Sequence, residues 1–212
     1  MIMKNKGILT VVSGFSGAGK GTIMKELLKK YEFALSISAT TRKPREGEEH
    51  GREYFFLTRE EFEDKIKEND FIEYAEYVGN YYGTPKSYVK EQLEQGKDVL
   101  LEIEMQGGML VKEQFPDAVL IFITPPSAEV LKKRLIGRGT EDIDTINRRI
   151  LRAGEEARFM KQYDYIVVND VLDFAVENVH NVIVTEHCKR ERQGQLIEQM
   201  TEELKLLGKE LV

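Results

Sequence analysis

The segment from Ser13 to Thr22, SGFSGAGKGT, constrains the fold of this chain more than any other. It contains the pattern G-x-x-x-x-G-K and lies between an apolar run, ILTVV at 8–12, and residues whose apolar side chains recur at helical spacing. Glycines in such a loop let backbone N–H groups point at phosphate oxygens, and the N-terminus of the following helix adds a positive dipole. The sequence therefore predicts a strand, a loop and a helix that bind nucleotide phosphates through Gly14, Phe15, Ser16, Gly17, Ala18, Gly19, Lys20, Gly21 and Thr22.

One position departs from the usual phosphate-loop pattern. Gly21 follows Lys20 where Ser or Thr is usual, and Thr22 comes one residue later. We expect Thr22 to help hold Mg²⁺, partly through water, although the pattern leaves open which hydroxyl does so. Two alternatives are a tight turn without a ligand and a dinucleotide-binding loop. The second is weaker because the glycine order is G-x-x-G-x-G and no acidic residue ends a second strand about 20 residues later.

Four short apolar runs predict the strands of the core. They are rich in β-branched residues and largely lack the alternation of a half-buried strand. Strands of this kind suit a parallel sheet that is buried on both faces, with helices on each side and right-handed crossovers. The predicted fold is therefore an α/β fold of the phosphate-loop NTPase type, with strands at ILTVV (8–12), VLLEI (99–103), AVLIFI (118–123) and YIVV (165–168).

Two stretches interrupt this core pattern. Residues 39–84 are rich in Tyr, Arg, Gly and acids, and FIEYAEYVGNYYG within them indicates a half-exposed strand that ends in a turn, so we expect an inserted mixed α/β lobe. Residues 128–158 predict two helices that move as a lid. Ser127 is a suitable N-cap for the first, which runs through Leu135, and GRG at 137–139 breaks it before a second begins near Thr140.

The tail beyond Cys188 predicts a terminal helix that packs on the body. Its apolar residues, Leu196, Ile197, Met200, Leu204 and Leu207, recur at helical spacing. The expected division of the chain is a core of residues 1–38, 85–127 and 159–190, an inserted lobe of 39–84, a lid of 128–158 and a helical extension of 191–212.

Composition excludes several classes of protein. The net charge of −6 argues against a broad surface for nucleic acid. Cys188 is the only cysteine, so no intrachain disulfide can form, and the three histidines do not suggest a metal cluster. The longest apolar run has six residues (118–123), against about 20 for a membrane-spanning helix. We therefore expect a cytoplasmic chain that binds neither nucleic acid nor a membrane.

The inserted lobe carries candidates for binding a second, anionic substrate. Arg42 and Arg45 flank a proline and form a rigid fork that could bind a phosphate by bidentate contacts. Glu73 and Thr84 offer a carboxylate and a hydroxyl, which suit the N1–H, N2–H₂ and O6 groups of guanine. Taken alone, a basic turn is more often simply solvated, and Glu73 more often an exposed strand residue.

Eight sequence blocks together resemble the guanylate kinase family, which belongs to the phosphate-loop nucleoside monophosphate kinases. They occur in that family's order and spacing over residues 7 to 187. The blocks are SGFSGAGKGT, SATTRKPREGE, REYFFLT, FIEYAEYVGNYYGT, LLEIEMQG, FITPPS, LKKRLIGRGTE and IVVND.

The resemblance implies a role for each matching residue. Arg42, Arg45, Tyr54 and Tyr82 would hold the GMP phosphate, while Glu73, Thr84 and Ser38 would recognise guanine. Glu102 and Glu104, at the end of a strand, would face guanine or hydrated Mg²⁺, and Glu104 stands where Asp is usual. Asn169 would line the adenine side, with Arg138 flanking the base. The cations around the transferred phosphoryl group would be Lys20, Arg42, Arg134, Arg138 and Arg149, while Lys132, Lys133 and Arg152 are expected to be solvated.

The implied reaction is transfer of the γ-phosphoryl group of MgATP to GMP, and also to dGMP, in purine nucleotide metabolism and GMP recycling. No tightly bound organic cofactor is expected, and the resemblance leaves open a monomer or a weak homo-oligomer. Two other functions remain. A non-catalytic protein-binding module of the same fold is disfavoured by the presence of Lys20, and a kinase for another nucleoside monophosphate is disfavoured by Glu73 and the SATTRKPR block.

Overall fold

The computed structural model of the chain describes residues 6–77, 79–137 and 142–210. Its centre is a five-stranded sheet in the order β2-β7-β1-β8-β9, and every pairing in this sheet is parallel. The predicted α/β fold is therefore confirmed. The strands are β1 (Leu9–Gly14), β2 (Ala34–Leu35), β7 (Val99–Glu102), β8 (Val119–Thr124) and β9 (Tyr165–Val168).

Burial distinguishes the inner strands of this sheet from its edge. All residues of β1 and nearly all of β7 and β8 are buried, as the continuous apolar runs predict. The expectation of two buried faces is wrong for β9, where Ile166 and Val168 are 45% and 49% exposed. The reason is position, because β9 is the last strand of the sheet.

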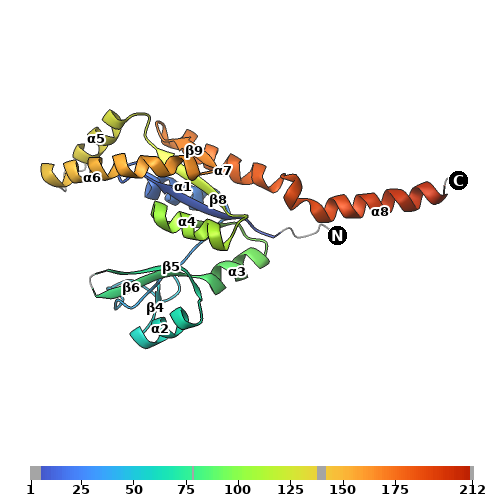
Figure 1. Ribbon diagram of the computed structural model, residues 1–212, viewed down its shortest axis with the longest axis horizontal. Coiled ribbons are helices and arrows are strands. Elements are labelled where there is room, and N and C mark those ends of the chain that lie inside the picture. Colours follow the sequence, from blue (N-terminus) through green and yellow to red (C-terminus); the bar gives the residue numbers. More distant parts are fainter. Residues whose placement is uncertain (1–5, 78, 138–141, 211–212) are drawn as a thin grey trace.

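Helices cover both faces of the sheet (Figure 1). Helix α4 (Met105–Gln114) packs on β1, and an ideal Cβ on its Gly108 would be in ordinary contact with Val11 Cγ1, at 3.5 Å, but only 2.8 Å from the Tyr163 hydroxyl. Helices α1 (Lys20–Lys30) and α7 (Leu172–His187) contact each other on the other face, where Ile23 and Leu27 of α1 are fully buried. The sheet and its helices thus form the main hydrophobic core and hold the carboxyl ends of β1, β7 and β8 at one edge.

A second, four-stranded sheet in the order β4-β3-β6-β5 lies below the core in Figure 1. It has a small core of its own, in which the ring of Phe62 stacks on Phe71 at 4.2 Å between centroids. Thr58 caps its helix with a reciprocal hydrogen-bonded pair to Glu61. This inserted lobe contains β3 (Ala39–Thr40), β4 (Phe55–Phe56), α2 (Arg59–Lys67), β5 (Phe71–Tyr77) and β6 (Asn80–Pro85), and α3 (Lys86–Glu94) returns the chain to the core.

The segment predicted to be a lid, residues 128–158, contains α5 (Ala128–Gly137) and α6 (Ile143–Glu156), and the 3₁₀ helix η1 (Ala157–Gln162) begins at its end. The Ser127 hydroxyl accepts a hydrogen bond from Val130 N at 3.2 Å, as the predicted N-cap requires. Helix α6 begins at Ile143, close to the predicted start, with Asp142 accepting a hydrogen bond from Thr145 N at 2.7 Å. The predicted functions of Arg138 and the break at 138–139 lie outside the described residues.

The C-terminal segment forms a helix but does not pack as predicted. After the short 3₁₀ helix η2 (Arg190–Arg192), α8 (Gly194–Glu210) extends away from the body (Figure 1), and every described side chain on it is exposed. Helical spacing identifies which side chains share a face, but not whether another element lies within reach of them. Neither α8 nor any other described helix has the length and apolarity needed to cross a bilayer.

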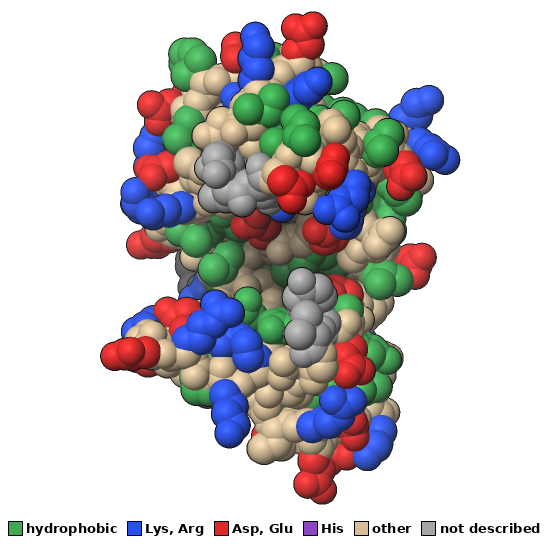
Figure 2. Space-filling view, turned by 90° about the vertical axis from the view of Figure 1, so that its left-hand side faces the viewer, with side chains coloured by type: hydrophobic (Ala, Val, Ile, Leu, Met, Phe, Trp, Pro, Cys, Tyr) green, Lys and Arg blue, Asp and Glu red, His purple; other side chains and the backbone are tan. Residues whose placement is uncertain are grey.

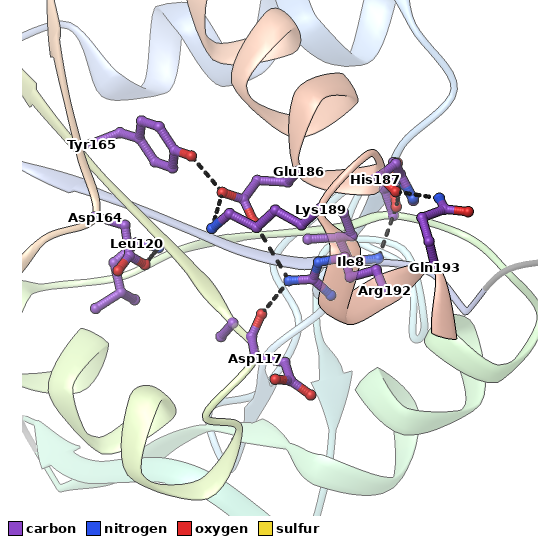
Figure 3. A network of polar contacts seen from close by, with 12 residues as sticks. Ile8, Asp117, Leu120, Asp164, Tyr165, Glu186, His187, Lys189, Arg192 and Gln193 are labelled. Carbon is purple, nitrogen blue, oxygen red and sulfur yellow. Dashed lines mark hydrogen bonds and ion pairs between the residues drawn. The ribbon is translucent and has the colours of Figure 1, made fainter. Parts of the chain in front are cut away.

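A network of charged groups joins the end of α7 to the turn before α8 (Figure 3). The carboxylate of Glu186, which is 1% exposed, accepts a hydrogen bond from the Tyr165 hydroxyl and lies 2.6 Å from Lys189 Nζ. Arg192 lies 3.7 Å from the same carboxylate and donates to the Asp117 carbonyl at 2.6 Å. Bonding to Glu186 raises the pKa of both Tyr165 and Lys189. The buried acid therefore fixes the position of the turn.

Replacing Glu186 by glutamine should lower the free energy of unfolding by about 2 kcal/mol, because two cations lose their charged partner. The loss stays below the 3–5 kcal/mol typical of a fully buried pair, since Lys189 is 52% exposed and can reach water. Urea unfolding of the two proteins measures the difference. The matched control is Glu191→Gln, an exposed partner of Arg190, for which a change below about 0.5 kcal/mol is expected. Equal effects of the two substitutions would contradict this account of Glu186.

Candidate active site

The phosphate loop follows β1 and ends at the first residue of α1. Gly17 and Gly19 have φ angles of 91° and 92°, a left-handed conformation that side chains other than glycine adopt at a cost. Space is also limited, because an ideal Cβ on Gly19 would lie 2.5 Å from Asn169 Nδ2 and one on Gly17 would lie 2.9 Å from Leu135 Cδ2. The two glycines therefore let the loop wrap tightly between the lid and the end of β9.

Lys20 lies across the opening of this loop. Its ammonium group donates to the carbonyl oxygens of Gly14 at 2.7 Å and Phe15 at 3.2 Å. The Phe15 ring packs edge-on against Phe122 of β8, with centroids 4.9 Å apart, which ties the loop to the core. The positive charge of Lys20 is thus held against backbone carbonyl oxygens at the start of the loop.

Asn169 and Arg134 meet on the other side of the loop. The buried Asn169 side chain donates to the Ala18 carbonyl at 2.8 Å, and Arg134 of α5 donates to the Asn169 backbone carbonyl at 2.9 Å. The structure thus brings together three segments that are distant in the sequence: the phosphate loop, the residue after β9 and the first lid helix.

A cleft of about 480 Å³ opens in front of the loop. Arg149 of α6 lies in its wall and donates to the Ser16 hydroxyl at 2.6 Å, so the second lid helix also contacts the loop. Figure 2 shows the molecule hollowed between its upper and lower parts, with acidic and basic side chains around the hollow. The residues that line the cleft are Gly14, Ser16, Lys20, Glu102, Ile103, Glu104, Met105, Arg149, Arg152 and Glu156.

Glu102 places a carboxylate opposite the loop at the end of β7. Surrounding protein atoms raise the pKa of Glu102 by partial desolvation, and the nearby positive charge of Lys20 opposes this effect. An ideal Cβ on Gly21 would lie 3.9 Å from Glu102 Oε2. The position where other phosphate loops carry a hydroxyl therefore faces a carboxylate here. Gly21 and Thr22 are both exposed at the start of α1.

Arg152 and Glu156 are residues of the cleft wall that the sequence pattern did not indicate. Arg152, which was expected to be solvated, lies 2.5 Å from Glu104 Oε2 and 2.8 Å from Glu156 Oε1, although it remains 60% exposed. Glu104 itself precedes α4, where the chain leaves β7. Spacing could have indicated the two residues, since positions 149, 152 and 156 share one face of a helix. Lys132 and Lys133 are exposed, as predicted.

Arg42, Tyr54 and Tyr82 come together in the inserted lobe. The Arg42 guanidinium lies 5.5 Å from the centroid of the Tyr54 ring, and the Tyr54 and Tyr82 rings are 6.1 Å apart. Glu48, which the sequence pattern did not single out, pairs with Arg42 at 3.0 Å. Hydrogen bonding to Glu48, with a smaller contribution from Tyr82, raises the pKa of Arg42. Arg45 is exposed, and its backbone N–H donates to Glu48 at 2.8 Å.

Glu73 and Thr84 form a hydrogen-bonded pair across β5 and β6. The Thr84 hydroxyl is fully buried and donates to Glu73 Oε1 at 2.7 Å. Burial raises the pKa of Glu73, and the bond from Thr84 partly offsets this. The alternative of an exposed strand glutamate is therefore wrong. An ideal Cβ on Gly107 of α4 would lie 3.6 Å from Glu73 Cγ, so this pair faces the core, and Ser38, immediately before β3, is half-buried.

Comparisons with known proteins agree with this geometry. The family model described as guanylate kinase matches residues 6–186. A guanylate kinase of Clostridium tetani is 54% identical over 187 residues, which is 88% of this chain and 90% of that protein. One from Streptococcus mutans is 52% identical over 207 residues, 96% of this chain and 99% of that protein. The crystal structure of guanylate kinase from Anaplasma phagocytophilum matches with a TM-score of 0.67 and 32% identity, over 89% and 90% of the two chains. The chain therefore belongs to the guanylate kinase family.

Proposed function

We propose that this chain transfers the γ-phosphoryl group of MgATP to GMP, giving ADP and GDP. The observation that carries the proposal is the arrangement of its charged groups. A phosphate loop with Lys20 and Arg149 faces one cleft, and the paired Glu73 and Thr84 lie across the hollow, next to α4. A triphosphate and a guanine nucleotide would therefore bind within one site.

The reaction needs no general base. A phosphate monoester has a second pKa near 6, so GMP is mostly a dianion at pH 7 and is already nucleophilic. The main obstacle is bringing this dianion to a negatively charged triphosphate in line with the bond that breaks. Positioned cations lower that barrier, which is how phosphoryl-transfer enzymes generally work.

At the ATP end, we assign the triphosphate to the loop of residues 14–22 and the transferred group to Lys20, Arg134 and Arg149, together with Arg138. The contact of Arg149 with Ser16 supports this, because it places a second positive charge at the same loop. Asn169 would line the adenine side, since its side chain is fixed against Ala18 at the outer end of the loop.

Magnesium would bind with ATP as part of the substrate. Mg²⁺ prefers oxygen ligands, usually with several water molecules retained. Thr22 and Glu102 supply a hydroxyl and a carboxylate beside Lys20. Gly21 has no side chain, which leaves room for water between the phosphate loop and the Glu102 carboxylate. This donor set fits a hydrated Mg²⁺ that lowers the negative charge of the triphosphate.

At the GMP end, Arg42, Arg45, Tyr54 and Tyr82 would bind the phosphate. Arg42 pairs with Glu48, so a bound phosphate would share or replace that carboxylate. Glu73 would accept from guanine N1–H and N2–H₂, with Thr84 and Ser38 as further hydroxyl contacts. Glu104 would contribute its carboxylate from the cleft wall. Because its side chain is longer than that of Asp, this carboxylate also reaches Arg152.

We further propose the three-part division into core, inserted lobe and lid, with a C-terminal extension. Each substrate would then contact a different part, and closure of lobe and lid would exclude water as a competing acceptor. The separate small core of the inserted lobe supports its movement as a unit.

The decisive test is a coupled assay of ADP release with GMP, AMP, UMP and dTMP as acceptors. We expect rapid turnover with GMP and a kcat/KM at least about a hundredfold lower with the other three, because a site built to pair polar groups rejects bases that leave them unpaired. No turnover with any acceptor would favour a non-catalytic binding module. Preference for another monophosphate would show that the assignment of Glu73 to guanine is wrong.

A further inference from the structure

Arg152 of α6 bridges two carboxylates that come from different parts of the chain. Its Nη2 donates to Glu104 Oε2 at 2.5 Å, and its Nε donates to Glu156 Oε1 at 2.8 Å. Glu156 lies one turn later on the same helix, whereas Glu104 lies 48 residues earlier, between β7 and α4. A planar guanidinium can bond two carboxylates through separate N–H groups in one fixed geometry, which an ammonium group cannot. Arg152 therefore ties α6 to the core at the wall of the cleft.

The position of the Glu104 carboxylate depends on this bond. Glu104 is the N-cap residue of α4, where side chains often accept from the first turn of the helix. Among the described residues, no N–H of that turn donates to its carboxylate. The side chain is 72% exposed, so without a partner it would be free to take up many conformations. The charge of Glu104 is in turn the largest cause that raises the pKa of Arg152.

The two acids at the end of β7 lie near different parts of the site. Glu102 is beside the phosphate loop, since an ideal Cβ on Gly21 would lie 3.9 Å from its Oε2. Glu104 begins the turn of α4 that contains Gly107, and an ideal Cβ on Gly107 would lie 3.6 Å from Glu73 Cγ. This arrangement puts Glu102 at the triphosphate end of the cleft and Glu104 on the side of the proposed guanine contact.

We propose that Arg152 is a positioning residue, which holds Glu104 ready to accept a hydrogen bond from the 2-amino group of the acceptor's guanine. The proposal rests on the proposed function, in which GMP is the acceptor and Glu73 accepts from N1–H and N2–H₂. The amino group has two hydrogens, so one remains for a second acceptor. The bond from Arg152 uses Glu104 Oε2, and a carboxylate has a second oxygen that can accept from a ligand. Arg152 acts on guanine through Glu104 and not by direct contact.

Comparison of GMP with inosine monophosphate, which lacks the 2-amino group, tests the proposal. Arg152→Ala should lower kcat/KM for GMP about fivefold through KM, with kcat within about twofold of wild type, because the bridge is partly exposed and contributes less than a buried pair. For inosine monophosphate, kcat/KM should stay unchanged. Arg152→Lys keeps the charge but not the two-carboxylate geometry, so it should recover the GMP value only in part. An equal loss with both acceptors, or no loss with GMP, would overturn the proposal.

The matched control is Arg148→Ala, which removes the same charge from an exposed position on α6. The hydrogen bond that the structure shows for Arg148 goes to Thr145 of the same helix, at 2.8 Å. This variant should leave kcat/KM unchanged for both nucleotides. A loss as large as that of Arg152→Ala, again confined to GMP, would mean that the charge of α6 and not the bond to Glu104 is responsible, and would overturn the proposal.

A double-mutant cycle tests whether Arg152 acts through Glu104. Glu104→Ala should lower kcat/KM for GMP at least as much as Arg152→Ala does, and adding Arg152→Ala to it should cause no further loss. Additive losses would show that the two residues act independently and would overturn the proposal.

Calorimetric titration with GMP separates this proposal from the proposed function, because binding needs no turnover. The wild type should bind GMP about fivefold more tightly than Arg152→Ala, matching the change in KM. A wild type that binds GMP but forms no ADP would contradict the proposed reaction and leave the role of Arg152 supported by this difference. Equal binding by the two proteins, or none by either, would overturn the role of Arg152 whatever the turnover.

Discussion

Replacing Lys20 by alanine is expected to lower kcat for ADP formation about 10²- to 10³-fold, with a much smaller change in KM for GMP. The reason is that the Lys20 charge acts on the phosphoryl group while negative charge moves during transfer, and such preorganised groups are worth this much. GMP would bind in the inserted lobe, away from this lysine. Steady-state rates with saturating GMP and MgATP measure the effect.

The control for Lys20 is Lys132→Ala, which removes an exposed lysine from α5. It should retain near wild-type kcat. Because Lys20 bonds to the Gly14 and Phe15 carbonyls, thermal unfolding of the Lys20→Ala protein should also be measured. An intact fold with wild-type turnover would remove Lys20 from the mechanism, whereas an intact fold with slow turnover supports it.

Replacing Glu73 by glutamine should lower kcat/KM for GMP about 10²-fold and reduce the preference for GMP over AMP. A carboxylate can accept hydrogen bonds from both N1–H and N2–H₂ of guanine, but an amide offers one oxygen and one NH₂ group. The amide therefore leaves one buried donor facing another donor, and unpaired groups of this kind are costly. The measurement is kcat/KM for each acceptor.

The matched control for Glu73 is Glu76→Gln on the same strand. Glu76 is exposed and points to the other face of β5, where it lies 3.6 Å from Arg59. It should leave both kcat/KM values unchanged. If the GMP preference were the same in Glu73→Gln as in the wild type, the guanine contact would have to be assigned to another residue.

Features built from contiguous residues could be predicted from the sequence. The phosphate loop is one, because its glycines, its lysine and the flanking strand and helix follow one another along the chain and need only local backbone geometry. The inner strands β1, β7 and β8 are a second such feature. A continuous apolar run of this length is typical of a strand in a sheet that is covered on both faces. The inserted lobe could also be recognised, because its composition differs from that of the core.

Contacts between distant segments could not be predicted in this way. The bond from Thr84 to Glu73, the pairing of Arg42 with Glu48 and the position of Arg152 beside Glu104 depend on how strands and helices are brought together. In each case the residue alone resembled a solvated charge or an exposed strand residue, and only its neighbours in space gave it a specific environment.

The sequence by itself determined the fold class, the loop that binds phosphates and the family to which the chain belongs, because these depend on local pattern and order along the chain. Only the tertiary structure decided which strand lies at the edge, which charges share the cleft and that α8 stands away from the body. Periodicity specifies the apolar face of an element, but burial also requires a second surface within reach, and the fold of the rest of the chain decides whether there is one.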